Sequence, residues 1–375
     1  MPPLGLVRLW ALLVRAGGFD SVLFEDHLQE FYPRALWDRR FSWLSTHAPS
    51  PHELFDFQVL LGSLAPRLGR TRVGVGVTEA IRRHPVVIAQ AMLTLAHMTR
   101  RPPILGVGAG ERLNTEPYGL DFSHPTGRLE EALEIIRLCL TSTGPIDYAG
   151  RHFRLEGAVL DLSAPPGRTP EIWVAAHGPR GLRLTGRYGD GWLPHVVSSP
   201  EEYGAKLEVI RAAARDAARN PDAITASLMQ YVVAAPTERR ARALLGSRLV
   251  RFLALVHPAE AWRRQGEHHP WGKGFRGYID ILPESLDPST LDEALAAVPF
   301  SVLDDVVIWG TPERVAEQLR AFGAAGLQHV AIGLMTAMIS RRGAAYAVYA
   351  NRRIAGLLAG RGLGSPRHRA PSTTG

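Results

Sequence analysis

Short apolar runs alternate with longer amphipathic stretches along most of this chain. Runs rich in Val, Ile and Gly predict buried strands, whereas apolar positions spaced three and four residues apart predict helices. We predict strands at 19–24, 71–78, 104–110, 171–176, 191–194, 228–233 and 329–334, and helices at 4–15, 85–99 and 128–140. Repeated strand-then-helix units favour a parallel sheet with right-handed crossovers, so the pattern predicts an α/β fold.

Seven predicted strands are one fewer than a closed (β/α)8 barrel needs. The segment from about 250 to 300 is rich in Pro, His, Trp and Gly, and we expect an irregular insertion that covers the barrel mouth before the last strand. Residues 359–375 are rich in Gly, Pro and Ser, and we expect them to be disordered. The remainder, 1–358, is expected to form a single barrel domain.

Composition narrows the class of protein. The chain has 375 residues, is 46% hydrophobic and carries a formal net charge of +7. Of its 43 basic residues only Lys206 and Lys273 are lysine, and the arginines are scattered rather than clustered with aromatic residues. This pattern argues against nucleic-acid binding, although a basic surface suits an anionic ligand. No stretch reaches the roughly 20 apolar residues of an integral membrane segment. The single cysteine, Cys139, has no internal disulfide partner, which favours a cytoplasmic location.

The stretch 104–111 has glycine at every second position and ends on Glu111. In a strand these glycines share one face, which leaves bare backbone against which a flat ligand can lie. Glycines that only ease packing inside a barrel explain the segment equally well. A dinucleotide-binding fingerprint needs G-x-G-x-x-G followed by a helix, whereas here the spacing is G-x-G-x-G and Pro117 and Gly119 predict a loop.

Two further strand ends carry candidate chemistry. Asp26 and His27 follow the first predicted strand, and histidine exchanges protons near neutral pH. Residues 176–180, Ala-His-Gly-Pro-Arg, follow another strand and predict an anion site built from helix amides and Arg180. No metal site is predicted, because His52-Glu53 is followed by Asp56 where a zinc-protease motif needs His.

In combination, these strand-end motifs resemble the bacterial luciferase-like superfamily, and within it the branch that uses the deazaflavin coenzyme F420. The closer resemblance is to phthiodiolone-type ketoreductases, which reduce a ketone in long-chain polyketide lipids, and it extends from about 17 to 333. The motifs are Asp26-His27, Gly74-Val75-Gly76-Val77-Thr78, Gly106-Val107-Gly108-Ala109-Gly110-Glu111 with Asn114, Ala175-Ala176-His177-Gly178-Pro179 and Gly186-Arg187-Tyr188-Gly189-Asp190-Gly191-Trp192.

The resemblance implies a (β/α)8 TIM barrel of the luciferase-like type, a homodimer, and a non-proline cis peptide between Gly76 and Val77. It implies that the protein binds F420 and a ketone of polyketide or lipid type, with His27 and Glu111 as catalytic acid and base. By position, it implies cofactor contacts at Asp26, Gly76, Val77, Thr78, Ala109, Gly110, Asn114, Ala176, His177, Gly178 and Arg180.

Two alternatives stay open at this point. The same fold also serves FMN-dependent monooxygenases, and a catalytically inactive cofactor-binding paralogue would keep many of the same motifs. Relatives have a strand before the first helix, whereas this chain reaches Phe19 with room for a helix only. We therefore expect either that the start codon is assigned too far downstream or that the barrel is open.

Overall fold

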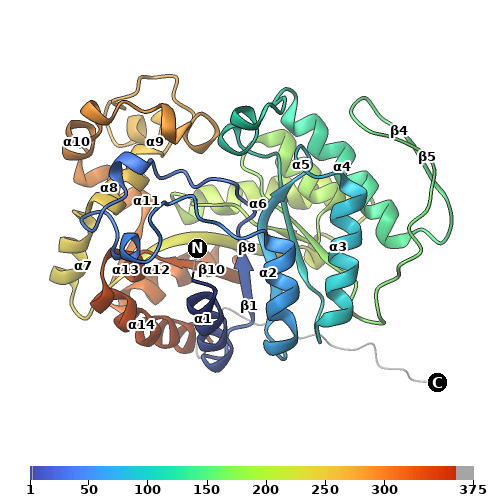
Figure 1. Cartoon of the computed structure of the whole chain (residues 1–375), viewed down its shortest axis with the longest axis horizontal. Helices are drawn as coiled ribbons and strands as arrows, with labels where there is room; N and C mark the ends of the chain where they lie inside the picture. Colours follow the sequence, from blue (N-terminus) through green and yellow to red (C-terminus); the bar gives the residue numbers. More distant parts are fainter. Residues whose placement is uncertain (2, 360–375) are drawn as a thin grey trace.

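A parallel sheet forms the centre of the protein (Figure 1). The structure is a computed structural model that describes residues 1 and 3–359. Its strands pair in the order β1-β2-β3-β6-β7-β8-β10, β9 also pairs with β8, and every pairing is parallel. The strands are β1 Ser21–Phe24, β2 Arg72–Glu79, β3 Ile104–Gly108, β6 Glu171–Val174, β7 Gly191–Trp192, β8 Thr225–Ala234, β9 Ile308–Gly310 and β10 His329–Leu334. All seven predicted strands are confirmed. The short strand β9 was not predicted, because three residues are too few to show a period.

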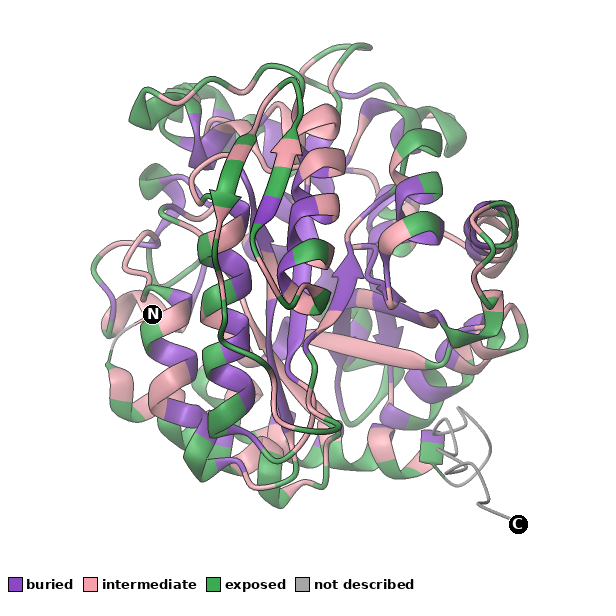
Figure 2. Ribbon diagram, turned by 90° about the vertical axis from the view of Figure 1, so that its right-hand side faces the viewer, coloured by how far each residue is buried: buried purple, intermediate pink, exposed green. Residues whose placement is uncertain are grey.

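Helices surround this sheet, and their inner faces are buried (Figure 2). Several begin with proline at the first helical position, where the missing N–H costs nothing. The predicted helices at 4–15, 85–99 and 128–140 are confirmed as α1, α3 and α4. The surrounding helices are α1 Leu4–Ala16, α2 Phe57–Leu64, α3 Pro85–Met98, α4 Pro125–Thr141, α5 Pro179–Tyr188, α6 Pro200–Asp216, α12 Pro312–Ala324 and α14 Arg341–Ala359. No helix in the described part of the chain combines the length and apolar content needed to cross a membrane.

The remaining elements lie outside the main sheet. An antiparallel hairpin, β4 Ile146–Ala149 and β5 Arg154–Ala158, projects beside α4 (Figure 1). The segment predicted to be irregular, 250–300, is irregular only in part. Short helices form where apolar faces pack together, and between 265 and 287 the chain is irregular apart from two short 3-10 turns. The helices of this segment and those beside it are α7 Glu238–Leu245, α8 Arg248–Leu255, α9 Ala259–Arg264, α10 Pro288–Ala296, α11 Phe300–Val306 and α13 Thr336–Ile339. Of the tail predicted to be disordered, 359–375, Ala359 is instead the last residue of α14, and the other residues lie outside the described ones.

The sheet ends at β1 and β10, so backbone hydrogen bonds do not close the barrel within residues 3–359. The two edges still lie close, because the Ser21 hydroxyl and His329 Nε2 are 3.1 Å apart. Every residue of β1 is partly exposed, whereas every residue of β3 is buried. Of the two expectations drawn from the sequence, the open barrel therefore agrees with the observed sheet, in which β1 and β10 are the two ends.

The alternating glycines of β3 have a packing role that the sequence left open. The bond Gly76–Val77 in β2 is cis, as the resemblance implied, and the register between β2 and β3 shifts there. A Cβ atom at Gly106 would lie 2.3 Å from the Val75 carbonyl oxygen and 2.9 Å from Val77 Cγ1. The face of Gly106 is therefore filled by the neighbouring strand, and the expected bare surface for a ligand is not found at this glycine.

The packing of Gly106 gives a stability prediction. Gly106→Ala should lower the free energy of unfolding by about 3 kcal/mol, because the added methyl group meets backbone that cannot move aside. Gly356→Ala, on the exposed face of α14 where a Cβ meets nothing within 4 Å, is the control. It should raise stability by up to about 1 kcal/mol through helix propensity. Denaturant unfolding of both variants measures the difference, and equal stabilities would contradict the packing role of Gly106.

Candidate active site

The fold brings the two predicted catalytic side chains together. His27 follows β1 and Glu111 follows β3, and β2 lies between these two strands. His27 Nε2 is 3.5 Å from Glu111 Oε2, with both side chains partly exposed. In a parallel barrel the carboxyl ends of the strands all face the same side of the molecule, so residues distant in sequence meet there. The pair can bind and hold a proton at this end of the sheet.

Asn114 fixes the loop that carries His27. Its buried side-chain oxygen accepts hydrogen bonds from the backbone N–H groups of Leu28, at 2.7 Å, and Gln29, at 3.1 Å. Its Nδ2 donates to Glu111 Oε2 at 3.4 Å. Asn114 was expected to contact a cofactor, and the structure shows in addition that it ties the histidine loop to the carboxylate.

Asp26 is the centre of a buried ionic network beside this pair. Its carboxylate is only 3% exposed and accepts a hydrogen bond from the Thr78 hydroxyl at 2.6 Å. Arg83 Nε donates to the same oxygen at 3.1 Å, and Arg82 forms an ion pair with it at 3.3 Å. Arg82 also pairs with buried Glu79. These contacts hold the end of β1 against the end of β2, and sequence reasoning missed both arginines because neither belongs to a motif.

The electrostatic surroundings of His27 favour its protonated form. Burial lowers its pKa, but the carboxylates of Glu111, Glu30 and Glu25 raise it by more, so the pKa lies above its ordinary value. Glu30 is a third residue that the sequence did not indicate. Burial is the main reason that its pKa rises to about 7, with Glu25 and Glu111 adding to the rise and His27 opposing it. The only sequence signal for Glu30 is its position three residues after His27.

The predicted anion turn is partly assembled. Gly178 is the N-cap of α5 without a side-chain cap, and a Cβ placed there would meet nothing within 4 Å. The backbone N–H of His195 points to His177 Nε2 at 3.3 Å. Ala176 is buried, and its carbonyl accepts a hydrogen bond from the Trp192 indole. Among the described residues, no side chain caps the first turn of α5, and the anion site there stays a prediction.

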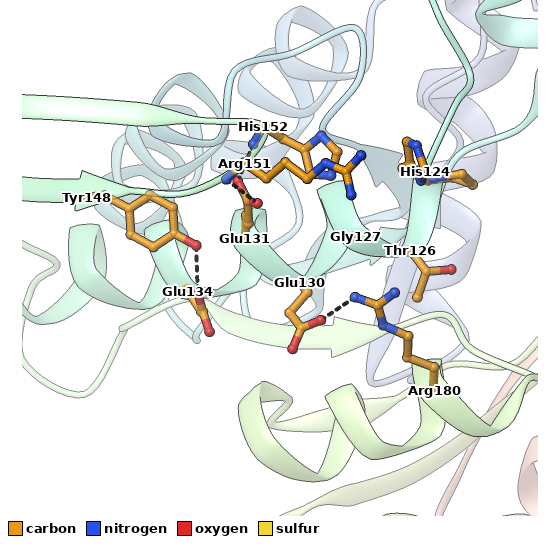
Figure 3. A pocket seen from close by; sticks show the side chains of 11 residues that line it. His124, Thr126, Gly127, Glu130, Glu131, Glu134, Tyr148, Arg151, His152 and Arg180 are labelled. Carbon is orange, nitrogen blue, oxygen red and sulfur yellow. Dashed lines mark hydrogen bonds and ion pairs between the residues drawn. The ribbon is translucent and has the colours of Figure 1, made fainter.

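Arg180 points elsewhere. Its guanidinium pairs with Glu130 at 2.6 Å in a polar groove of about 500 Å³ between α4, the β4–β5 hairpin and α5 (Figure 3). Glu131 in this groove already accepts three backbone N–H groups, and Glu134 accepts the hydroxyls of Tyr148 and Tyr188. The carboxylates of this groove thus have partners within the protein. Neither His27 nor Glu111 lines the groove.

The other residues predicted to contact the cofactor lie in β2 or directly after β3. Val77 packs in the barrel interior beside a small cluster formed by Ile104, Trp173 and Leu193. Ala109 and Gly110 follow β3, and Gly110 needs its freedom because its φ is +88° and Glu79 lies alongside. Gly76 faces the side chains of Leu23 and Met229.

One aromatic residue of the insertion reaches the strand ends. Tyr278 places its hydroxyl 3.3 Å from that of Tyr231 on β8, and its ring meets Phe31 edge-on. The ring of His195 lies against both tyrosines. Of the other aromatic residues of the insertion, Trp262 is buried with its indole bonded to the Ala254 carbonyl, and Trp271 and Phe275 pack around His269.

A parallel barrel sheet with a histidine–carboxylate pair at the carboxyl ends of its strands is the arrangement of an α/β-barrel enzyme. Comparison with known proteins makes the assignment specific. Residues 4–329 match the luciferase-like monooxygenase family, and the chain belongs to this family of oxidoreductases. It is 39% identical over 335 residues to the phthiodiolone/phenolphthiodiolone dimycocerosates ketoreductase of Mycobacterium tuberculosis strain H37Rv, covering 88% of each chain.

Solved structures share the fold at low sequence identity. The coenzyme F420-dependent tetrahydromethanopterin reductase from Methanopyrus kandleri superposes with a TM-score of 0.73 at 18% identity, covering 95% of this chain and 96% of that one. An F420-dependent secondary alcohol dehydrogenase in complex with an F420-acetone adduct gives 0.69 at 20% identity, covering 89% and 90%. The oxygenating constituent of 3,6-diketocamphane monooxygenase from Pseudomonas putida, in complex with FMN, gives 0.61 at 18% identity, covering 95% and 91%.

The Asp26 network gives a second stability prediction. Asp26→Asn keeps the shape but removes the carboxylate that Arg82 and Arg83 share, which leaves Arg82 with Glu79 and Arg83 with Asp56. This loss should cost about 3 kcal/mol. Asp56→Asn is the matched control, since Asp56 contacts the same Arg83 but its side chain is 42% exposed. Asp56 is the N-cap of α2, and asparagine caps helices about as well as aspartate. This control should therefore lose less than about 1 kcal/mol. Equal losses in the two variants would show that the buried network does not stabilise the fold.

Proposed function

We propose that this protein is a coenzyme F420-dependent oxidoreductase that reduces the ketone of a polyketide-type or lipid substrate. The observation that carries the proposal is the His27–Glu111 pair at 3.5 Å, held at the strand ends by Asn114. The relative that is 39% identical is named as a ketoreductase, and two structural neighbours are named as F420-dependent.

The residues present fit a deazaflavin. His27 Nδ1 is buried and has no hydrogen-bond partner within the described part of the chain, so a polar group of a ligand can satisfy it. The open amides at Gly178 suit the phosphate of the cofactor. We assign the cofactor contacts to Asp26, Gly76, Val77, Thr78, Ala109, Gly110, Asn114, Ala176, His177 and Gly178. Arg180, also implied by the resemblance, is left out of this proposal because its guanidinium pairs with Glu130 in the outer groove.

The chemistry divides between cofactor and protein. Reduced F420 supplies a hydride when it is bound, and the protein supplies orientation and a proton. The carbonyl oxygen of a ketone gains negative charge during reduction, and His27 is the donor that neutralises it. Glu111 keeps His27 protonated and oriented before transfer. Without a charged donor at this point, reduction would place an unneutralised oxyanion against the strand ends.

The alternative function is an FMN-dependent monooxygenase, which the family description and the FMN-bound neighbour favour. A catalytically inactive cofactor-binding paralogue is the third possibility. Titration with oxidised F420 and with FMN separates the first two, because each has its own absorbance. Tight FMN binding without F420 binding would overturn the proposal.

Substitutions in the pair test the assigned roles. His27→Ala and Glu111→Gln should each lower kcat by about 10²–10⁴-fold, the usual contribution of a general acid. The dissociation constant for F420 should change only a few-fold. His124→Ala, in the outer groove, is the control and should retain full turnover. If F420 binding collapses in Glu111→Gln while the fold is intact, Glu111 holds the cofactor rather than the proton donor.

We also propose that the protein is a homodimer that pairs through α2 and α3. A groove of about 360 Å³ between these helices is lined by uncharged residues, and Val59 on it is 74% exposed. The small residues Gly62 and Ala91 allow close helix approach, and the absence of charge from the lining means that two copies meet without repulsion.

Sedimentation velocity tests the dimer. Val59→Arg should shift the protein from dimer to monomer, because it places two cations at a self-facing contact. Val159→Arg, at a residue that is 60% exposed and lies beyond β5, should leave the dimer unchanged. A dimer that persists in Val59→Arg would exclude this face as the interface.

A further inference from the structure

Two tyrosine hydroxyls meet near the carboxyl end of β8. Tyr278, on the insertion, donates a hydrogen bond to the Tyr231 hydroxyl at 3.3 Å. Each hydroxyl carries one hydrogen, so the bond between them uses one of the two. Within residues 3–359 the Tyr231 hydroxyl has no further hydrogen-bond partner, and its hydrogen is therefore available to a ligand.

The tyrosine pair lies beside residues that we assign to the cofactor. The ring of His195 contacts both tyrosine rings, with centroids 4.7 and 5.3 Å away, and its backbone N–H donates to His177 Nε2 at 3.3 Å. Met229 comes two residues before Tyr231 on β8, so the two side chains share one face of the strand. Met229 Cε would lie 3.3 Å from a Cβ atom at Gly76, which places this face toward the end of β2.

The pair also reaches the loop that carries His27. The Tyr278 ring meets the ring of Phe31 edge-on at 5.1 Å, and Phe31 is four residues after His27 in the chain. Burial is the main reason that the pKa of Tyr278 is raised, and the charge of Glu111 adds to the rise, which agrees with this placement. The tyrosine pair and the His27–Glu111 pair therefore border the same end of the sheet.

The turn that carries Tyr278 is rigid. Gly277 has a φ of +81°, and a Cβ atom there would lie 2.8 Å from the Pro258 ring, so only glycine fits. Arg276 Nε donates to the Asp280 carboxylate at 3.0 Å, which closes the turn on its other side. The Tyr278 hydroxyl is thus presented by a fixed turn and not by a free loop.

The backbone next to His195 is strained. Val196 has a φ of +56°, a region that β-branched residues rarely adopt, and its N–H donates to the Met229 carbonyl at 2.8 Å. Such conformations persist only where the surrounding structure imposes them, and they are common at functional sites. Here the strained residue follows the histidine whose ring lies against both tyrosines.

The electrostatics of the cluster suit an uncharged ligand. Burial raises the pKa of both tyrosine hydroxyls above the ordinary value, so both keep their hydrogens. Burial also lowers the pKa of His195 to about 3, so its ring is neutral. The carboxylates of Glu111 and Glu30 act on Tyr278, and they would repel an anion. A carbonyl oxygen is an uncharged acceptor that fits these surroundings.

We propose that Tyr231 and Tyr278 bind the carbonyl oxygen of the ketone substrate, with the free hydroxyl hydrogen of the pair as donor. This inference rests on the proposed function, since it takes a ketone as the substrate. The pair is a second donor to the oxygen that gains negative charge during reduction, whereas His27 transfers the proton.

The direct test is NMR of protein in which the ring carbon that bears each tyrosine hydroxyl is isotope-labelled, with and without oxidised F420. Tyr231→Phe and Tyr278→Phe assign the two resonances. Methyl hexyl ketone should shift the Tyr231 resonance, whereas octanoate, which has the same number of carbons and a charge, should not. If saturating ketone shifts neither resonance in either state, the proposal is overturned.

Ligand affinity gives a second readout, measured by calorimetry. Tyr231→Phe should raise the dissociation constant of methyl hexyl ketone about 3–10-fold, the usual effect of one hydrogen bond. Tyr278→Phe should raise it less, because Tyr231 keeps its hydrogen. Tyr203→Phe is the matched control, since it removes a buried hydroxyl that bonds to the Ser227 carbonyl at 3.1 Å from α6, and it should leave ketone affinity unchanged. Wild-type affinity in folded Tyr231→Phe would contradict the proposal.

The outcomes separate this inference from the proposed function. If wild type binds the ketone through Tyr231 but does not reduce it with F420, the proposed function fails and the binding site stands. If wild type reduces the ketone while the tyrosine resonances and the ketone affinity of Tyr231→Phe stay unchanged, the reverse holds. If Tyr231→Phe does not fold, the resonance shift in wild type decides.

Discussion

The hydrogen bonds of Asn114 are the constraint on which the candidate site depends. One buried amide accepts two backbone N–H groups of the loop after β1 and donates to Glu111 after β3. Two strands that do not touch each other thereby present a histidine and a carboxylate at a fixed separation. The Asp26 network supports the same loop from the side of β2, because it ties the end of β1 to Thr78 and to two arginines.

The loop after β1 is also held by the insertion. Phe31, Tyr32 and Phe41 belong to a second hydrophobic core, which includes Phe252 on α8 and lies apart from the core of the barrel. His27 and Glu30 lie just before Phe31 and Tyr32 in the chain. The loop is therefore held at two places, by the hydrogen bonds of Asn114 and by the packing of these aromatic side chains, and it has little freedom. The insertion therefore stabilises the loop that carries the site, and its Tyr278 adds a hydroxyl beside it.

The sequence predicts the strands well, because buried parallel strands are apolar runs bounded by turn residues. It also places His27 and Glu111 at strand ends, and the parallel topology brings them together. Periodicity could not show that Gly106 accommodates Val77 rather than a ligand, since this depends on how β2 packs against β3. Arg82, Arg83 and Glu30 were missed for the same reason: each acts through a tertiary contact that leaves no local pattern. The helices of the insertion escaped prediction because they are short and separated by proline and glycine.

The central claim is that the pair at the strand ends serves F420-linked ketone reduction. An anaerobic single-turnover experiment with reduced F420 and a long-chain ketone tests it most directly. The account predicts that one molecule of F420 is oxidised for each molecule of alcohol formed, without oxygen. Substrate oxidation that requires oxygen and reduced FMN, with no reaction of reduced F420, would contradict the account.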